Sequence, residues 1–454
     1  MILAYTPDLD FKTIIPCYNY RWHEKYLWAI HSVVFQQLRN KNTFNGYVNL
    51  DSDLLKKYLG TDYYKYVLNQ LMNAKIIEPM LNEKGVQCYS KGAFSKAYRI
   101  NPQILQTTRI KATPILKKTY SRKITNVRSQ LIKEAIRLNP NVQHELLMLT
   151  YRRIKYDEAL NHINTNYEPN TPQYQARIIA LNEFNEMHKA NFQTGKEVLN
   201  FHFSYNKGRV YSPASMLPRD LEQFTYFTDY ENEPSICLDL PNSQLCFFDE
   251  LVKRKSYKKV EHIGREVVEE NRRESERPET VKKPTYPLAN IPSLCVRNLS
   301  TWQNYIYTGK GYERIMQISK WKDKSEGHTK EERQQFKEVF FGELFYNKYI
   351  PNYLTPLEKA FKEAHPNEAN NLRTIKKQLG NKLLAVEVQK LEGKFFHDIC
   401  LTHIKTNYKD IPFTIKHDSI TLPRSCASFL VDELNRLIHD FFNTTELNFK
   451  CDEL

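Results

Sequence analysis

The stretch Phe413–Leu422 (FTIKHDSITL) places Asp418 inside a run of β-branched and aromatic residues, which predicts strand structure. Far upstream, Asp239 ends the apolar run Ile236–Leu238, which predicts a second strand. Two carboxylates presented by two strands can share a pair of divalent cations, the arrangement used for two-metal phosphoryl transfer. Asp239 and Asp418 are therefore candidate catalytic residues and metal ligands, although a single aspartate at a strand end is usually a turn former.

The composition is that of a basic, globular chain. Its 454 residues, 41% of them hydrophobic, are enough for about two to four domains with a sizeable core. Gly is scarce at 13 residues while Tyr and Phe number 29 and 24, which argues against a fibrous or disordered protein. The net charge of +14 favours a polyanionic partner, with nucleic acid first and an anionic membrane surface second.

Targeting and redox signals point to the cytoplasm. No two of the eight cysteines have CxxC spacing, so neither a zinc knuckle nor a redox pair is predicted, and reduced thiols are expected. The N-terminal residues MILAYTPDLDFK lack the basic start and long apolar run of a signal peptide. No stretch of 18 apolar residues predicts a transmembrane helix, so no membrane partner is expected.

Residues 21–100 predict a small unit with winged-helix order, in which helices are followed by a two-stranded wing. A small structural helical domain with a hairpin gives the same pattern. The predicted elements are, in order, Trp22–Leu38, a strand at 48–50, a helix capped by Ser52 and ended by Gly60-Thr61, Tyr64–Asn73, and a hairpin of Ile76–Glu78 with Lys96–Ile100.

Two further regions are distinguished by charge. Residues 101–200 predict a mainly helical, basic region, whose cations are typical of a solvated helix face or of a surface that follows a phosphate backbone. Residues 252–288 are dense in Lys, Arg and Glu with few large apolar groups, which predicts an exposed insertion.

The stretch Thr329–Tyr346 (TKEERQQFKEVFFGELFY) predicts an amphipathic helix that begins with a capping box of Thr329 and Glu332. Arg333 and Lys337 lie one turn apart on one face. Two cations in this arrangement suit the phosphate oxygens of a nucleoside triphosphate. The same pattern also fits a surface helix whose long cationic side chains extend into water.

Aromatic residues continue this face toward the helix end. Phe341 follows Lys337 by one turn, and Phe345 lies close to the same face. A ring beside two cations can stack on the base or sugar of a nucleotide. Gly342 costs about 1 kcal/mol in a helix relative to Ala, so we expect it where a ligand approaches closely.

Two helices are predicted to flank the FTIKHDSITL stretch. Lys382–Cys400 precedes it, with Gln389 and Glu392 on the polar side of the helix. Ser425–Phe442 follows it as an amphipathic helix that should pack beneath the sheet.

Four motifs, in order, resemble those of the right-hand polymerases, which group family A DNA polymerases with single-subunit phage-type RNA polymerases. GRVY at Gly208–Tyr211 resembles an RNA polymerase sequence, and DLPNSQ at Asp239–Gln244 resembles the first palm motif. RxxxKxxxFG, from Arg333 to Gly342, is similar to the fingers-helix motif. HDSITLP at His417–Pro423 resembles the second palm motif, in a form closer to the RNA polymerases. The resemblance covers about residues 200–430.

The resemblance implies an α+β, mostly helical fold: a right-hand polymerase with an antiparallel palm sheet, helical fingers and thumb, and an N-terminal winged-helix-like domain. The implied parts are the winged-helix-like domain at 1–100, a helical thumb-like region at 101–200, the palm at 201–251 and 381–454, the charged insertion at 252–288 and the fingers at 289–380.

The resemblance also implies site residues. Asp239 and Asp418 would bind two Mg²⁺ ions, Lys337 would stabilise charge on the α-phosphate, and Arg333 would hold the β- and γ-phosphates. Further nucleotide contacts would come from Phe341, Gly342, Phe345, Tyr346 and Gln244. Contacts with template or primer would come from Arg209, His417 and Gln389.

The chain departs from the family pattern at positions that govern the choice of sugar. Two extra residues separate Asp239 from Ser243-Gln244, which predicts a bulge or a shifted turn. The glutamate that excludes ribose in the DNA polymerases is absent, and either Cys246 or Gln244 takes its place, depending on the alignment. In the fingers motif Phe345 replaces the family tyrosine and Tyr346 the following glycine.

The leading expectation is a template-directed polymerase of a phage or mobile element, without a proofreading exonuclease. It would act as a monomer in the bacterial cytoplasm on a DNA template, a primer or transcript, and nucleoside triphosphates, with a DNA product slightly favoured. The alternatives are a phage-type DNA-directed RNA polymerase, a winged-helix DNA-binding replication initiator with an inactive palm, and an untemplated terminal transferase. The sequence leaves the priming mode and the biological role open.

Overall fold

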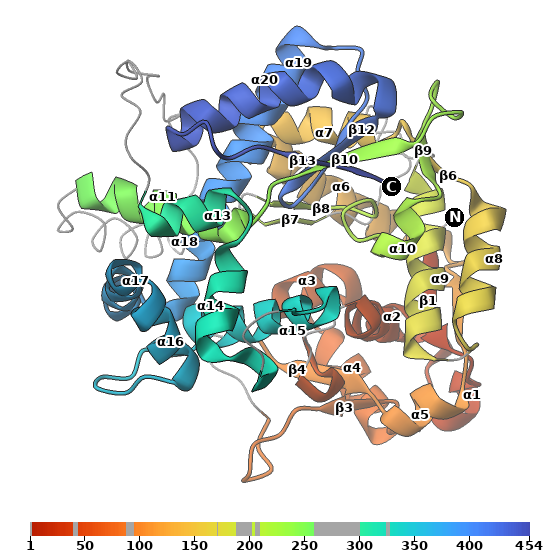
Figure 1. Ribbon diagram of the computed structural model, residues 1–454. Coiled ribbons are helices and arrows are strands. Elements are labelled where there is room, and N and C mark those ends of the chain that lie inside the picture. Colours follow the sequence, from red (N-terminus) through yellow and green to blue (C-terminus); the bar gives the residue numbers. More distant parts are fainter. Residues whose placement is uncertain are drawn as a thin grey trace. The chain divides into compact units, whose positions relative to one another are not determined.

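The computed structural model describes residues 2–39, 44–87, 95–169, 171–187, 202–204, 209–257, 300–323 and 327–454. These residues are mostly helical and include small antiparallel sheets, which confirms the predicted α+β, mostly helical class (Figure 1). The chain divides into two compact units. The first comprises residues 1–203, 210–235 and 454, and the second residues 204–209 and 236–453.

The first unit contains the helices and hairpin predicted for residues 21–100. Its three short strands form an antiparallel sheet in the order β2-β4-β3. The elements are α2 (His23–Arg39), β2 (Val48–Asn49), α3 (Ser52–Leu59), α4 (Tyr64–Asn73), β3 (Ile77–Pro79) and β4 (Ala97–Ile100).

Local sequence signals set both ends of α3. Asp51, rather than the predicted Ser52, caps the helix, because its carboxylate accepts hydrogen bonds from the N–H groups of Asp53 and Leu54. Gly60 ends the helix as predicted, with a φ of 99° that glycine adopts without steric strain.

Further helices and two small sheets complete the first unit. Strand β1 (Leu3–Pro7) pairs with β5 (Ile110–Pro114), and β6 (Arg152–Ile154) pairs with β9 (Thr225–Phe227). The region predicted to be helical, residues 101–200, is mainly helical where it is described. The helices are α1 (Phe11–Ile14), α5 (Pro102–Thr107), α6 (Lys118–Leu138), α7 (Asn141–Leu149), α8 (Tyr156–Asn166), α9 (Pro172–Asn185) and α10 (Arg219–Glu222).

The second unit contains a four-stranded sheet in the order β11-β12-β10-β13. Its strands are β10 (Ser235–Asp239), β11 (Thr414–Lys416), β12 (Ser419–Pro423) and β13 (Lys450–Glu453). Strands β11 and β12 form an antiparallel hairpin, and β10 pairs antiparallel with β13. Helix α20 (Arg424–Phe442) packs against β12, as predicted for the helix after this strand (Figure 1).

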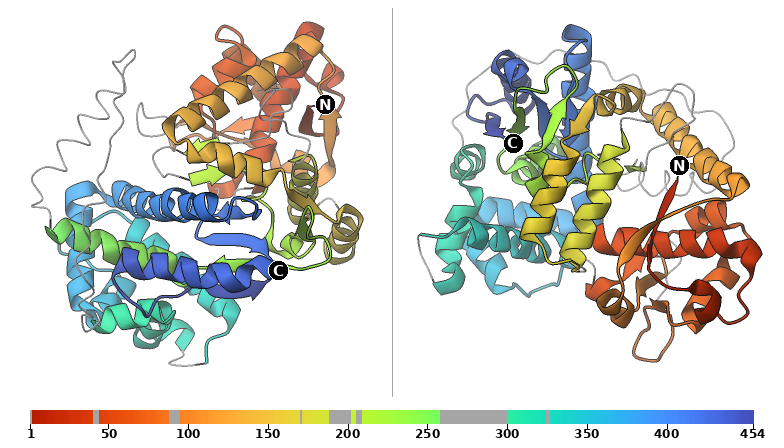
Figure 2. Two further views of the ribbon diagram at one scale, coloured as in Figure 1. Left: turned by 90° about the horizontal axis from the view of Figure 1, so that it is seen from above. Right: turned by 90° about the vertical axis from the view of Figure 1, so that its right-hand side faces the viewer.

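Helices surround the sheet of the second unit. Helices α11 and α18 pack against each other, as the green and light-blue segments of Figures 1 and 2 show. The helices are α11 (Ser243–Tyr257), α13 (Thr301–Tyr307), α14 (Gly311–Ser319), α15 (Lys330–Phe340), α16 (Pro356–Ala364), α17 (Pro366–Leu379), α18 (Asn381–Gly393) and α19 (Leu401–Asn407), with π-helices at Phe341–Tyr346 and Lys394–Cys400.

Three further expectations concern the charged insertion, the cysteines and membrane-spanning helices. Of the charged segment 252–288, only residues 252–257 at the end of α11 are described, and the rest lies outside the described residues. The cysteines within the described ranges are free thiols, as expected. In the same ranges, no helix has the length and apolar character needed to cross a membrane.

Candidate active site

The two predicted catalytic aspartates lie at the same end of adjacent strands. Asp239 is the last residue of β10, and Asp418 immediately precedes β12. The backbone N–H of Leu240 donates a hydrogen bond of 3.1 Å to the carbonyl oxygen of Asp418. Because hydrogen-bonded strands lie about 4.8 Å apart, this bond places the backbones of Asp239 and Asp418 on neighbouring strand ends. Both side chains are half-buried.

Asp418 lies in a turn and not within a strand, which corrects the predicted position. Lys416 pairs with Ser419, so His417 and Asp418 form the two-residue loop of the β11–β12 hairpin. His417 has a φ of 57°, a left-handed conformation that short hairpin loops require and that is uncommon for residues other than glycine. Among the described residues, the Asp418 carboxylate has no hydrogen-bond or ion-pair partner.

Leu240, Pro241 and Asn242 of DLPNSQ connect β10 to α11. Strand β10 ends at Asp239 and α11 begins at Ser243. Asn242 has a φ of 52°, and its side-chain amide donates a hydrogen bond of 3.1 Å to the carbonyl of Ile306 in α13. This bond holds the turn after Asp239 against the end of α13.

The structure separates the two alternatives for the position of the missing glutamate. Cys246 is fully buried, and its thiol lies 3.6 Å from the carbonyl oxygen of Pro241. Burial raises the pKa of this thiol well above its ordinary value. Gln244 is only half-buried. Of these two side chains, only that of Gln244 is partly exposed to solvent.

Three residues predicted to share one face of the fingers-motif helix lie around the ring of Tyr312 in α14. We call Arg333, Lys337 and Phe341 the stripe of α15. The Arg333 guanidinium lies 5.4 Å and the Lys337 ammonium 5.8 Å from the centroid of this ring. The ring of Phe341 lies 6.1 Å from it. The three residues therefore share one face, as the spacing predicts. Lys337 has no ion-pair partner among the described residues.

Tyr312 connects this stripe to Asp418, and sequence reasoning missed it. It is buried, and its hydroxyl has no hydrogen-bond partner in the part of the chain that the structure describes. Burial raises the pKa of Tyr312 well above its ordinary value, Arg333 opposes the shift, and the charge of Asp418 adds to it. The charges of Arg333 and Asp418 therefore act on the pKa of Tyr312 in opposite directions.

A second route connects α15 to Asp239 through Gly309, in the loop before α14. Arg333 donates hydrogen bonds to Glu313 at 2.5 Å and to the carbonyl of Gly309 at 3.4 Å. The ammonium of Lys450 lies 3.3 Å from the point where a Gly309 Cβ would stand. Lys450 is directly opposite Asp239 in the β10–β13 register, so the two side chains share one face of the sheet.

Lys450 is thus a site residue that sequence reasoning missed. It is exposed, and none of the described residues forms an ion pair or hydrogen bond with its ammonium. No local motif identifies it, because its position depends on the pairing of β13 with a strand far away in the sequence.

Arg209 binds a protein carboxylate in this structure. Its guanidinium donates a hydrogen bond to Glu392 of α18, whose side chain is only 1% exposed. This burial contradicts the prediction that Glu392 lies on the polar side of its helix. Burial raises the pKa of Glu392 to about 7, Arg209 opposes the shift, and Asp418 adds to it. Gln389, one turn earlier, is half-buried as part of the same helix.

The aromatic end of the stripe differs from the prediction. The α-helix ends at Phe340 and continues as a π-helix, in which Phe341 and Phe345 are buried. They pack against each other with ring centroids 5.2 Å apart, so neither ring is open to a nucleotide in this conformation. Tyr346 is 44% exposed, and a Cβ added at Gly342 would meet no atom within 4 Å.

The chemistry of the two aspartates fits Mg²⁺. Within the described ranges there is no group of three or more His, Cys, Asp and Glu side chains suited to a metal ion. Mg²⁺ is usually bound by one or two carboxylates, with water and substrate phosphates completing its coordination. Asp239 and the unpartnered carboxylate of Asp418 supply that number of ligands.

Comparison of the sequence with models of known protein families finds no match, and neither does comparison with curated proteins. The function therefore has to be inferred from the residues and geometry of the site.

Proposed function

We propose that the chain is a template-directed nucleotidyltransferase that extends a nucleic-acid strand on a DNA template. The observation that carries the proposal is the hydrogen bond from Leu240 to Asp418, which joins the ends of β10 and β12 and sets Asp239 beside Asp418. Three cations support it. Arg333 and Lys337 lie against the ring of Tyr312, and Arg333 also bonds to the carbonyl of Gly309, close to the ammonium of Lys450. Lys450 is directly opposite Asp239 in the sheet.

In the proposed reaction, Asp239 and Asp418 would hold two Mg²⁺ ions, which would supply Lewis-acid activation of the attacking hydroxyl and charge stabilisation of the leaving pyrophosphate. Lys337 neutralises charge on the transferred phosphate or donates a proton to the leaving group. Arg333 releases the carboxylate of Glu313 and binds the phosphates of the triphosphate instead. The exchange costs little because both partners of this ion pair are more than one-third exposed, at 38% and 40%.

The finer architecture belongs to the same proposal. The four-stranded sheet would be the palm of a right-hand polymerase, and α14, α15 and the following π-helix would belong to the fingers. The helices of residues 101–200 would form a thumb-like region, and residues 1–100 a winged-helix-like domain that binds DNA. We place such an enzyme in the bacterial cytoplasm as a monomer encoded by a phage or mobile element.

RNA synthesis is the second candidate, and Gln244 favours it. Gln244 is half-buried at the start of α11, where alignment on Asp239 places the glutamate that excludes ribose in DNA polymerases. An amide does not impose the charge of that glutamate on a 2′-hydroxyl. DNA as the product is still slightly favoured by the fingers motif, so the choice of sugar is part of the test.

A primer-extension assay with Mg²⁺ tests the proposal. Deoxynucleotides and ribonucleotides are offered separately to the full chain, with and without a primer, on templates of defined sequence. We expect templated extension that Asp418→Asn lowers by about a thousandfold or more, because one of two metal ligands is lost. Product that ignores the template sequence would instead indicate a terminal transferase.

The matched control is Asp432→Asn, which removes an exposed carboxylate from α20 of the same unit. It should extend primers like the unchanged chain. Equal activity of Asp418→Asn and the unchanged chain would overturn the mechanism. A complete lack of extension, with sequence-specific DNA binding retained, would favour the replication initiator with an inactive palm.

A further inference from the structure

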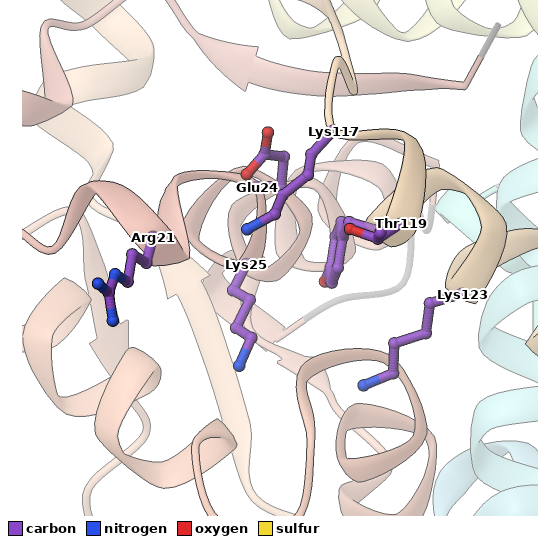
Figure 3. A pocket seen from close by; sticks show the side chains of 7 residues that line it. Arg21, Glu24, Lys25, Lys117, Thr119 and Lys123 are labelled. Atoms are coloured by element: carbon purple, nitrogen blue, oxygen red, sulfur yellow. The ribbon is translucent and has the colours of Figure 1, made fainter.

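The first unit contains a cavity of about 260 Å³ between the start of α2 and the start of α6. Figure 3 shows the side chains of Lys25, from α2, and Lys123, from α6, extending to the same side of this cavity. The lining residues are Arg21, Glu24, Lys25, Lys117, Thr119, Tyr120 and Lys123. All of them belong to the first unit, so the cavity is independent of the candidate active site.

The cavity has an excess of positive charge. Four of its lining residues are cationic and only Glu24 is acidic. Among the described residues, none of these cationic side chains forms an ion pair. Burial lowers the pKa of Lys25, and the neighbouring charges of Lys123 and Lys117 lower it further. Cations gathered at this cost are stabilised when an anion binds between them.

The start of α6 adds uncharged donors. Its first turn has neither a capping side chain nor an acidic residue. The N–H of Tyr120 already donates to the carbonyl of Lys117, so the N–H groups of Lys118 and Thr119 are the ones left for an anion. Tyr120, in the same turn, is only 7% exposed, and its hydroxyl has no hydrogen-bond partner within the described ranges. An unpaired buried hydroxyl costs free energy, which a phosphate oxygen would recover as a hydrogen bond.

Aromatic rings lie next to these cations. The ammonium of Lys25 lies 3.7 Å from the ring centroid of Tyr63. Tyr63 and Tyr66 are 43% and 39% exposed, and both pack against Trp22, with ring centroids 5.4 Å and 4.8 Å away. Exposed rings beside a cationic groove are the arrangement that binds single-stranded nucleic acid, because bases stack on the rings while cations hold the phosphates.

We propose that this cavity binds a phosphate group of a single-stranded nucleic acid, and that adjoining bases stack on Tyr63 and Tyr66. Lys25, Lys123 and the first turn of α6 hold the phosphate, and Tyr120 donates a hydrogen bond to it. The site lies in the first unit alone and does not depend on the polymerase chemistry of the second.

The test is the binding of a fluorescently labelled single-stranded oligonucleotide to the full chain, measured by anisotropy. The double variant Lys25→Gln/Lys123→Gln should weaken binding at least tenfold. The matched control is Lys133→Gln/Arg137→Gln, which removes the same charge from exposed positions of α6 and should bind like the unchanged chain. Equal affinities of the two double variants would overturn the proposal.

Two further variants test the details of the site. Tyr120→Phe removes only the unpaired hydroxyl and should weaken binding about threefold to tenfold, with no loss of folding by circular dichroism. Tyr63→Ala should weaken binding of the oligonucleotide but not of inorganic phosphate. Inorganic phosphate that displaces the oligonucleotide at comparable concentration would assign the cavity to a free phosphate and overturn the nucleic-acid part. These binding measurements do not depend on primer extension, so the phosphate site and the proposed polymerase activity can fail separately.

Discussion

Lys450 and Asp239 share one face of the β10–β13 pair, and this places a free ammonium next to a proposed metal ligand. If the sheet edge binds a triphosphate, Lys450→Ala removes one phosphate contact. We expect the KM for the nucleotide to rise about threefold to tenfold while kcat changes less, because the contact exists in the bound substrate as well as in the transition state. Steady-state primer extension at varied nucleotide concentration measures both constants.

Lys450→Arg should retain most of the affinity, since it keeps the charge. Arg424→Ala serves as a control, because it removes another exposed cation, which pairs with Glu453 of the same strand. An unchanged KM for Lys450→Ala would remove Lys450 from the nucleotide site.

Glu392 provides a pH test at the residue scale. Its pKa is raised from 4.5 to about 7 in the folded chain, chiefly by burial. Between these two values the folded state binds more protons than the unfolded state, so stability falls as the pH rises through this window. In Glu392→Gln the free energy of unfolding should fall less across this pH window, and the difference from the unchanged chain should be on the order of 1–3 kcal/mol.

Thermal unfolding between about pH 5 and pH 8 measures the effect of Glu392→Gln. Glu446→Gln, at an exposed position, should keep the slope of the unchanged chain. Parallel profiles for Glu392→Gln and the unchanged chain would show that the buried pair with Arg209 does not titrate in this range.

The sequence identifies some residues of the site better than others. Asp239, Asp418, Arg333 and Lys337 belong to short motifs, so their residue types and spacing suffice to single them out. Glu392 and Lys450 depend on helices and strands that meet only in the folded chain. Glu392 is buried although glutamate is usually exposed. The ion pair with Arg209 of β8 (Arg209–Tyr211) stabilises the buried charge, and this partner lies too far away in the sequence to be predicted.

At the scale of the element, the change from α-helix to π-helix after Phe340 sets the surroundings of Gly342. Gly342→Ala should raise the stability by about 0.5–1 kcal/mol, because alanine is the better helix former and the added Cβ meets no atom within 4 Å. If a nucleotide uses this open space, the same variant should raise the nucleotide KM. Thermal unfolding and primer extension of one preparation measure the two effects.

Glu338→Ala, on the exposed side of α15, is the control for Gly342→Ala, and it should leave the KM unchanged. A more stable Gly342→Ala variant with unchanged KM would show that the space beside Gly342 is not used by the substrate.

Element prediction succeeded where the signals are local. The capping box at Thr329 and the break at Gly60 are set by residues within one turn of the helix end. The π-helix after Phe340 could not be predicted from the sequence, because the contacts that favour it come from residues far away along the chain. Lys376, buried on α17, donates a hydrogen bond of 3.0 Å to the carbonyl of Leu344 and thereby satisfies a backbone group of this irregular turn.

At the scale of the whole molecule, the net charge of +14 predicts a strong salt dependence of nucleic-acid binding. Each phosphate that the protein neutralises releases counterions, so the logarithm of the binding constant falls linearly with the logarithm of the salt concentration. We expect the affinity for DNA to fall at least roughly tenfold between about 50 and 200 mM salt. Fluorescence anisotropy at several salt concentrations measures the slope, and an affinity independent of salt would contradict a phosphate-based interaction.

The pairing of β10 with β12 also has a kinetic consequence. These strands close a long stretch of chain, and the entropy of closing such a loop has to be overcome before the pairing contributes any free energy. Local helices form much faster than contacts of this kind. During renaturation from denaturant, far-ultraviolet ellipticity should therefore return before β10 pairs with β12, and catalytic competence should be among the last properties that the chain regains.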